Sequence, residues 1–163
     1  MSHLLKILTF LVIIVNNQNL KAENKFTYGI GLGVASYGGL GVNVGVVSPN
    51  DVKYLSFGAV SYGSLQGFNY ILGLGWSRTD IIKTASNKHG LGIFAGIVDQ
   101  ELDVDKYSNI HGEQNVYGGG LTYNYYFNGI QNSGAKIGIA ILYGYYEDDK
   151  ESIIGSIEVG YQF

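Results

Sequence analysis

Bulky apolar residues alternate with small residues along most of the chain after residue 22, and glycine supplies many of the small positions. Successive side chains of a β-strand point to opposite faces, so an alternation of period two predicts strands with one apolar face. Eight such segments recur between turn-forming residues, at about 26–35, 40–46, 52–62, 69–77, 90–98, 117–127, 136–145 and 153–163. No segment after residue 22 has helical spacing. The sequence therefore predicts an all-β domain.

Some details of these segments are less regular. The first is predicted to run to Ala35 and to end in a tight connection at residues 36–39. The third is predicted to point Leu55, Phe57 and Ala59 outward, and the fifth to point Ile97 outward. A long stretch then separates the fourth segment from the fifth, so either the fourth strand continues through residues 81–82 or its register differs from the predicted one.

The composition of the two faces decides which of them points outward. On nearly every segment one face is wholly apolar, and the other carries Gly, Ser, Thr, Asn or Gln. An eight-stranded barrel has little room inside, so the bulky set would overfill it. Strands of about ten residues also suit a tilted crossing of a bilayer. The sequence predicts an eight-stranded antiparallel up-and-down transmembrane β-barrel whose apolar face meets lipid.

Aromatic residues collect at both ends of the predicted strands. Membrane barrels carry such rings at the two interfaces, where an apolar ring meets polar headgroups. One end is predicted to carry Phe26, Tyr28, Trp76, Tyr125, Phe127, Tyr161 and Phe163, and the opposite end Tyr62, Tyr70, Tyr117, Tyr143 and Tyr145. The middles of the strands carry Leu, Ile and Val. Two aromatic girdles are therefore predicted.

The first 22 residues have the pattern of a secretory signal peptide. Lys6 gives a basic start, residues 7–15 are apolar apart from Thr9, and Ala22 is the candidate cleavage point. This nine-residue stretch is too short for a transmembrane helix, which needs about 20 residues. The chain is predicted to consist of a signal peptide, residues 1–22, and a β-barrel, residues 23–163.

The last seven residues, Ile-Glu-Val-Gly-Tyr-Gln-Phe, end the chain on an aromatic residue with apolar residues at alternate positions before it. This ending resembles the carboxy-terminal strand of bacterial outer-membrane proteins. With the signal peptide and the strand count, the mature chain resembles small outer-membrane barrels of the OmpA transmembrane, OmpX and opacity-protein type. The resemblance implies a Gram-negative outer membrane, both termini in the periplasm, and recognition of Tyr161 and Phe163 by the barrel-assembly machinery. The long connection after Arg78 departs from the short periplasmic turns of that group.

Charge and cysteine content limit the partners. Without the two lysines of the signal peptide, eight basic and thirteen acidic residues remain, and the chain has no Cys. No basic patch is available for nucleic acid. The acidic connections of the predicted outer side are interpreted as solvated loops, and divalent-cation contacts with lipopolysaccharide are the alternative. A closed barrel has no sheet edge left for pairing, so a monomer surrounded by outer-membrane lipid is expected.

The predicted interior carries a few polar side chains, namely Glu158, Lys136, Asn43, Asn124 and Gln162. Glu158 is the acid inside a predicted strand, and a buried charge needs a partner. Lys136 and Arg78 are the available cations, so we interpret Glu158 as a member of an interior ion pair, with a charged gate in a narrow pore as the alternative. The inward glycines either leave a water-filled passage or are covered by neighbouring aromatic rings.

The sequence favours a structural or surface-interaction barrel over an enzyme. The alternatives are a narrow porin-like channel for small solutes or ions and a lipid-modifying outer-membrane enzyme. For the enzyme, only His111 with Ser108 and Glu113 forms a local group of the required residue types. The sequence predicts no cofactor and no metal site.

Overall fold

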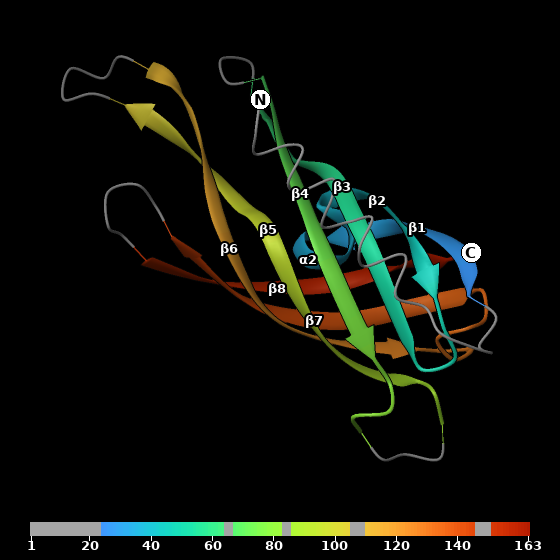
Figure 1. Ribbon diagram of the computed structural model, residues 1–163. Coiled ribbons are helices and arrows are strands. Elements are labelled where there is room, and N and C mark those ends of the chain that lie inside the picture. The colour runs from blue at the N-terminus through green and yellow to red at the C-terminus, as the bar shows by residue number, and fades with distance from the viewer. Residues whose placement is uncertain (1–23, 64–66, 83–85, 105–109, 146–150) are drawn as a thin grey trace, which may run out of the picture.

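The computed structural model describes residues 24–63, 67–82, 86–104, 110–145 and 151–163, and these form one closed barrel of eight antiparallel strands in up-and-down order (Figure 1). The strands are β1 Lys25–Gly33, β2 Gly39–Val47, β3 Asp51–Gly63, β4 Gly67–Arg78, β5 His89–Val104, β6 Ile110–Tyr126, β7 Gly134–Tyr145 and β8 Glu151–Gln162. The predicted strand number and topology are confirmed. The predicted signal peptide lies outside the described residues.

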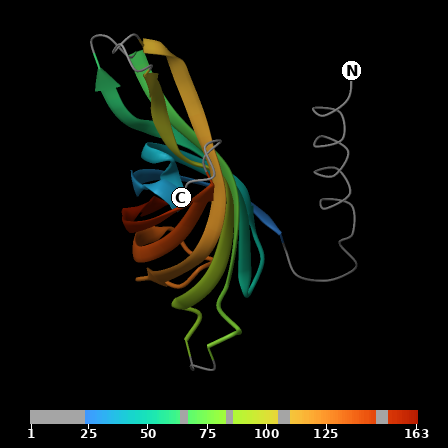
Figure 2. The same ribbon diagram turned by 90° about the vertical axis from the view of Figure 1, so that its left-hand side faces the viewer.

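The hairpins differ in height. The β3–β4 and β5–β6 hairpins extend beyond the other strands at one end of the barrel (Figures 1 and 2). Strands β5 and β6 run well past the segments predicted for them because register shifts at Ile97/Asp99 and Asp103/Val104 interrupt the alternation while pairing continues. The first shift also overturns one prediction. Ile97 is 7% exposed and packs inside, although the pattern predicted that it faces outward.

The first strand ends earlier than predicted, because the chain leaves the wall and enters the barrel. A short helix, α2, spans Val34–Tyr37, where the sequence predicted the end of a strand and a tight turn. Gly33, with φ 128°, and Gly38, with φ 68°, flank the helix in backbone conformations that other residues rarely adopt. Ala35, Ser36 and Tyr37 have no exposed surface. The helix is therefore a plug inside the barrel.

This inward turn shortens the seam that closes the barrel. Strand β1 pairs with β8 only where Gly29–Leu32 face Gln162–Val159. Over the rest of β8, residues 151–158, the described partner is β7 alone. The backbone N–H of Val34 donates to Ser156 Oγ at 3.0 Å in place of a ladder hydrogen bond. The expectation of a monomer assumed that no sheet edge remains, and this assumption does not hold over the full height of β8.

The outer wall is apolar and the interior is mixed. Leu55 and Phe57 of β3 are exposed on the outside, as the alternation predicted, while Tyr54 and Ser56 are buried. Inside, one cluster of apolar side chains packs around Phe94 and Leu142, and a second contains Tyr54 and Tyr126. The interior also contains buried polar side chains, and several of them surround helix α2.

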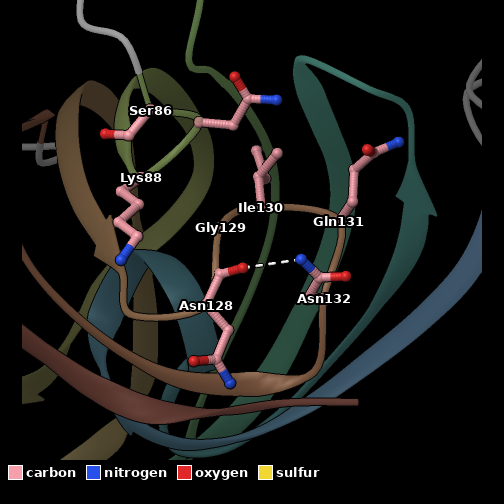
Figure 3. A pocket seen from close by; sticks show the side chains of 8 residues that line it. Ser86, Lys88, Asn128, Gly129, Ile130, Gln131 and Asn132 are labelled. Carbon is pink, nitrogen blue, oxygen red and sulfur yellow. Dashed lines mark hydrogen bonds between the residues drawn. The ribbon is translucent and has the colours of Figure 1, made fainter.

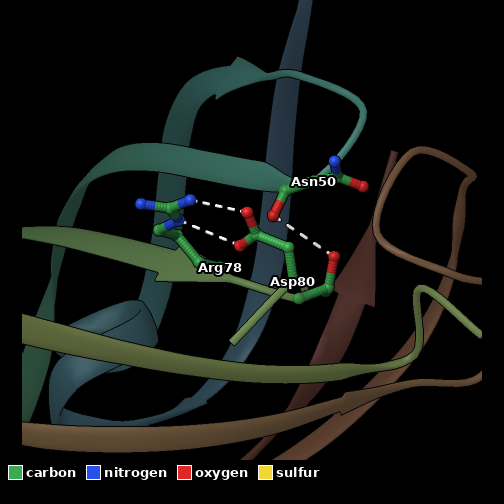
Figure 4. Close-up of polar contacts among 4 residues, drawn as sticks. Asn50, Arg78 and Asp80 are labelled. Atoms are coloured by element: carbon green, nitrogen blue, oxygen red, sulfur yellow. Dashed lines mark hydrogen bonds and ion pairs between the residues drawn. The ribbon is translucent and has the colours of Figure 1, made fainter. Parts of the chain in front are cut away.

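The connection from β4 to β5 is long, and strand β4 does not continue through it. Strand β4 ends at Arg78 and β5 begins at His89, so the alternative of a strand through residues 81–82 is wrong. The connection begins by folding back on the β2–β3 turn, where the Asn50 carbonyl oxygen accepts a hydrogen bond from the Thr79 N–H at 2.8 Å. It also accepts one from the Thr79 hydroxyl at 3.2 Å, and this is the bond drawn to Asn50 in Figure 4. Arg78 and Asp80 form an ion pair beside it.

Candidate functional site: the polar layer around the interior helix

All five polar residues predicted for the interior are buried there. They come from four strands: β2 supplies Asn43, β6 supplies Asn124, β7 supplies Lys136, and β8 supplies Glu158 and Gln162. Four of the five are linked through helix α2 or its hydrogen-bond partners, and Asn124 has no such link among the described residues.

The Glu158 carboxylate holds the start of α2. Its Oε2 accepts a hydrogen bond from the Ser36 N–H at 2.8 Å, and its Oε1 accepts one from the Ala35 N–H at 3.2 Å. The first N–H groups of a helix have no partner within the helix and favour a negative charge. Glu158 itself is 0% exposed. The carboxylate therefore replaces water as the partner of these donors.

Lys136 is buried beside the same helix and is enclosed by aromatic rings. Its Nζ donates to Ser36 Oγ at 3.0 Å and lies 4.7 Å from the ring centroid of Tyr37. The rings of Tyr54 and Tyr126 follow at 5.8 and 5.9 Å. Negative ring faces attract a cation, and more strongly where water is excluded. This cage offsets part of the cost of burying the ammonium group.

The predicted interior ion pair takes a different form from the one expected. The salt bridges among the described residues do not include one between Lys136 and Glu158, and Ser36 links the two through its N–H and its hydroxyl. Arg78, the other candidate cation, lies at the end of β4 and pairs with Asp80 at 2.5 Å. It is not a partner of Glu158.

The Ser36 carbonyl oxygen anchors a third set of contacts. Asn43 Nδ2 donates to this oxygen at 2.9 Å, and Gln162 Nε2 donates to Asn43 Oδ1 at 3.3 Å and to Thr27 Oγ1 at 2.6 Å. All polar groups of Ser36 are thus used. Sequence reasoning missed Ser36, and the one signal for it was the pair of glycine positions that flank Val34–Tyr37.

Aromatic rings cover several of the inward glycines. A side chain at Gly160 would overlap the Tyr37 hydroxyl, one at Gly75 would overlap the Tyr54 ring, and one at Gly73 would overlap the Phe94 ring. This agrees with the interpretation that rings cover these glycines, and it leaves no water-filled passage at these three positions. Helix α2 and the tyrosines that cage Lys136 fill the middle of the barrel.

Replacing Gly160 with alanine is expected to lower the free energy of unfolding by about 1–3 kcal/mol, because the added methyl group displaces Tyr37 and overpacks the interior. The matched control is Gly155→Ala on the same strand, where an added Cβ meets nothing within 4 Å. That change should raise stability by about 0.4–1 kcal/mol, since alanine restricts the unfolded chain. Urea unfolding of both refolded variants measures the difference. Equal effects would contradict the packing of Tyr37 on β8.

Asn124 is buried without a described partner for its amide. It is 0% exposed, and neither Nδ2 nor Oδ1 has a hydrogen bond to any of the described residues. Because an unsatisfied buried polar group costs about 1–3 kcal/mol, Asn124→Leu, which keeps the branched shape and the number of heavy atoms, should raise the free energy of unfolding by about 1 kcal/mol. Asn43→Leu is the control and should lower it, because Asn43 is hydrogen-bonded to Ser36. A loss of stability in Asn124→Leu would indicate a bound water instead.

The residues predicted for the aromatic girdles lie on the outer wall. Phe26, Tyr28, Trp76, Phe127, Tyr161, Phe163, Tyr70, Tyr117, Tyr143 and Tyr145 are exposed, and Tyr125 is half-buried. The side chain of Tyr62 lies outside the described residues. Tyr28 stacks on Phe163 with centroids 4.9 Å apart, and Phe163 contacts Tyr161 at 4.7 Å. The predicted assembly signal is thus packed against the first strand.

A hollow of about 330 Å³ lies at the end of the barrel, where the β6–β7 turn meets the end of the β4–β5 connection (Figure 3). Its lining is polar and carries one titratable side chain, Lys88. The turn is held together internally, since Asn132 Nδ2 donates to the Asn128 carbonyl oxygen at 2.8 Å. Ile130 N–H ties it to the Asn87 carbonyl oxygen at 2.9 Å. The lining offers no nucleophile–base pair.

The one histidine side chain that the structure describes, His89, does not belong to the group considered for catalysis. His89 contacts Tyr123 Oη at 2.8 Å and packs against the Tyr125 ring. The side chains of Ser108, His111 and Glu113 lie outside the described residues. Among the side chains that are described, no group of three His, Asp or Glu residues could hold a metal ion. The helices in this part of the chain include none long and apolar enough to cross a membrane.

No family model, curated protein or solved structure matches this chain. The function therefore has to be inferred from the barrel itself. Two properties are informative: an outer wall of exposed apolar side chains, and an interior in which charged groups are held by a plug helix.

Proposed function

We propose that the chain is an integral β-barrel of a Gram-negative outer membrane, with a structural or surface-interaction role and no catalytic activity. The observation that carries the proposal is the outer wall. Large apolar side chains are exposed on all eight strands, with Ile30, Leu40, Phe57, Leu72, Ile93, Leu121, Ile139 and Ile157 as examples. Soluble proteins rarely expose large apolar patches, and a barrel in lipid requires this pattern.

Export by the signal peptide at residues 1–22 and insertion by the barrel-assembly machinery, which would read Tyr161 and Phe163, belong to the same proposal. Both termini then lie in the periplasm. Phospholipid and lipopolysaccharide are the surrounding partners. The exposed rings at both ends of the strands support this placement, because aromatic side chains favour the two membrane interfaces.

The interior favours this role over a solute pore. Helix α2 and the rings of Tyr37, Tyr54 and Tyr126 occupy the middle of the barrel, and Glu158 fixes the helix from the wall. A pore would require this plug to move. We therefore expect the wild-type barrel to show no steady conductance in planar bilayers.

The test is gel mobility of the full-length protein in isolated outer membranes. A membrane barrel stays folded in detergent without heating, so we expect a membrane-resident band that shifts when the sample is boiled. A soluble periplasmic protein without a shift would overturn the proposal and favour a lipocalin-like binder. Single-channel recording of the refolded protein then separates the structural role from a pore.

A further inference from the structure

Residues 151–158 of β8 have a free edge beside the point where β1 leaves the wall. The Phe163 N–H donates to the Tyr28 carbonyl oxygen at 2.8 Å, so the odd-numbered residues at this end of the chain direct their backbone groups toward β1. The described pairing with β1 stops at Val159, and the N–H and C=O groups of Ile157 therefore face no described strand. In the proposed bilayer such unpaired groups are costly, so a strand that covered this free edge would be stabilised.

The register of the seam points the end of β1 at this free edge. Leu32 is paired with Val159, and a continuation of the same register would bring Val34 opposite Ile157. The sequence allows such an extension, because the alternation of β1 continues through Ala35. Val34 would then face outward beside Ile157, as Leu32 faces outward beside Val159. A longer β1 would thus pair with β8 without exposing a polar side chain on the wall.

In the structure, the backbone donors that follow β1 bind side chains of β8 instead. The Val34 N–H donates to Ser156 Oγ at 3.0 Å. The N–H groups of Ala35 and Ser36 donate to the carboxylate of Glu158 at 3.2 and 2.8 Å. Strand β8 therefore offers this segment two sets of acceptors, namely side-chain oxygens for the helix and backbone oxygens for a strand. A segment with two sets of partners on one neighbour can occupy two positions.

Glycines at both ends of the segment allow the change. Gly33 has φ 128° and Gly38 has φ 68°, and glycine adopts both these angles and extended ones at little cost. Any side chain at Gly33 would overlap the Glu158 carboxylate when the segment is helical. Replacing Gly33 with alanine therefore opposes the helical position and changes no charge.

We propose that residues 34–37 are a gate with two positions. In the first, which the structure shows, they form the plug helix α2 and the carboxylate of Glu158 holds them inside the barrel. In the second, residues 34–35 extend β1 along the free edge of β8, and the ring of Tyr37 leaves the ammonium group of Lys136. The inference rests on the proposed membrane location and goes beyond the structural role, because the second position opens a passage through the barrel.

Disulfide cross-linking of the refolded barrel tests the second position, since the chain has no cysteine of its own. The first pair is Val34→Cys with Ile157→Cys. In the plug, Val34 packs against the interior cluster while Ile157 is exposed on the outer wall, so the two side chains point to opposite faces. They meet only when residue 34 joins the strand. The control pair is Val34→Cys with Ile153→Cys, about 13 Å farther along the same face of β8.

We expect copper-phenanthroline oxidation to cross-link the first pair and to leave the control pair largely reduced. Glu158→Ala should speed up cross-linking of the first pair about tenfold or more, because the plug loses two hydrogen bonds to a charged group. Gly33→Ala should act in the same direction. Equal rates for the two pairs would show a loose segment instead of a strand, and no cross-link in any background would show a fixed plug. Either result overturns the proposal.

Single-channel recording of the oxidised first pair then tests whether the second position opens the barrel. The cross-linked protein should conduct ions, and a reductant should silence it, because the segment is then free to return to the interior. A cross-linked barrel that stays silent would overturn the gate. The heat-dependent gel shift of each variant is measured in parallel, so failure of the gate is distinguished from failure to form a membrane barrel.

Discussion

Replacing Glu158 with alanine is expected to lower the free energy of unfolding of the barrel by about 3–5 kcal/mol, the usual cost of removing one partner from a buried charged pair. Two N–H groups of α2 lose their acceptor, and Lys136 stays buried with its countercharge removed. Both losses act on groups that water does not reach in the folded barrel, which is why the effect should exceed that of an ordinary surface change.

Urea unfolding of the refolded barrel, followed by the fluorescence of its single tryptophan, measures this effect. Glu158→Gln is the conservative variant. Its amide oxygen still accepts a hydrogen bond but carries no charge, so the loss should be smaller. Lys136→Met in the Glu158→Ala background should recover part of the stability, because it removes the uncompensated cation. Additive effects of the two substitutions would show that Ser36 does not couple them.

The same variants test what α2 does. If Glu158 fixes the plug, Glu158→Ala should show intermittent conductance in planar bilayers while the wild type is silent. Conductance that is steady in the wild type and changes in Glu158→Gln would instead support the pore interpretation. Silence in every variant would leave α2 as an element of packing alone.

The strand pattern predicted much of this fold because an alternation of period two is a property of each strand by itself. The inward face of the wall could be told from the outward face because it carries Gly, Ser, Thr, Asn and Gln. The same alternation places Glu158 and Lys136 on the inward face of their strands, so their burial could also be predicted. None of these inferences needed contacts between distant segments.

The parts that were missed depend on contacts or on single backbone angles. Helix α2 has four residues, too few to show a helical period, and its first two residues continue the alternation of β1. The positive φ of Gly33 turns the chain inward, and only then do the N–H groups of Ala35 and Ser36 meet Glu158. The bulge after Ile97 likewise arises in the pairing of β5 with β6. Because the sequence does not show the inward turn of α2, a direct ion pair of Glu158 was expected. In the structure Ser36 instead links Glu158 to Lys136.

Arginine in place of Ile139 should destabilise the barrel in lipid by about 2–4 kcal/mol, as expected for a cation near the midplane of a bilayer. Ile139 is 54% exposed on β7, between Lys136 at one end and Tyr143 at the other, so the cation would lie within the apolar band. An arginine side chain that faces water has no such cost. The same substitution on a barrel in aqueous solution would remove exposed apolar surface and leave stability within about 0.5 kcal/mol.

The matched control is Gln131→Arg in the exposed β6–β7 turn, which should leave stability unchanged because the turn lies beyond the strands. Refolding into vesicles of a short-chain phosphatidylcholine, with urea titration in both directions, measures the two variants against the wild type. If Ile139→Arg lowers the free energy of unfolding strongly and Gln131→Arg does not change it, the outer wall of the barrel is surrounded by lipid. Equal stability of the two variants would contradict the membrane placement, and the exposed isoleucines and leucines would then need a protein partner to cover them.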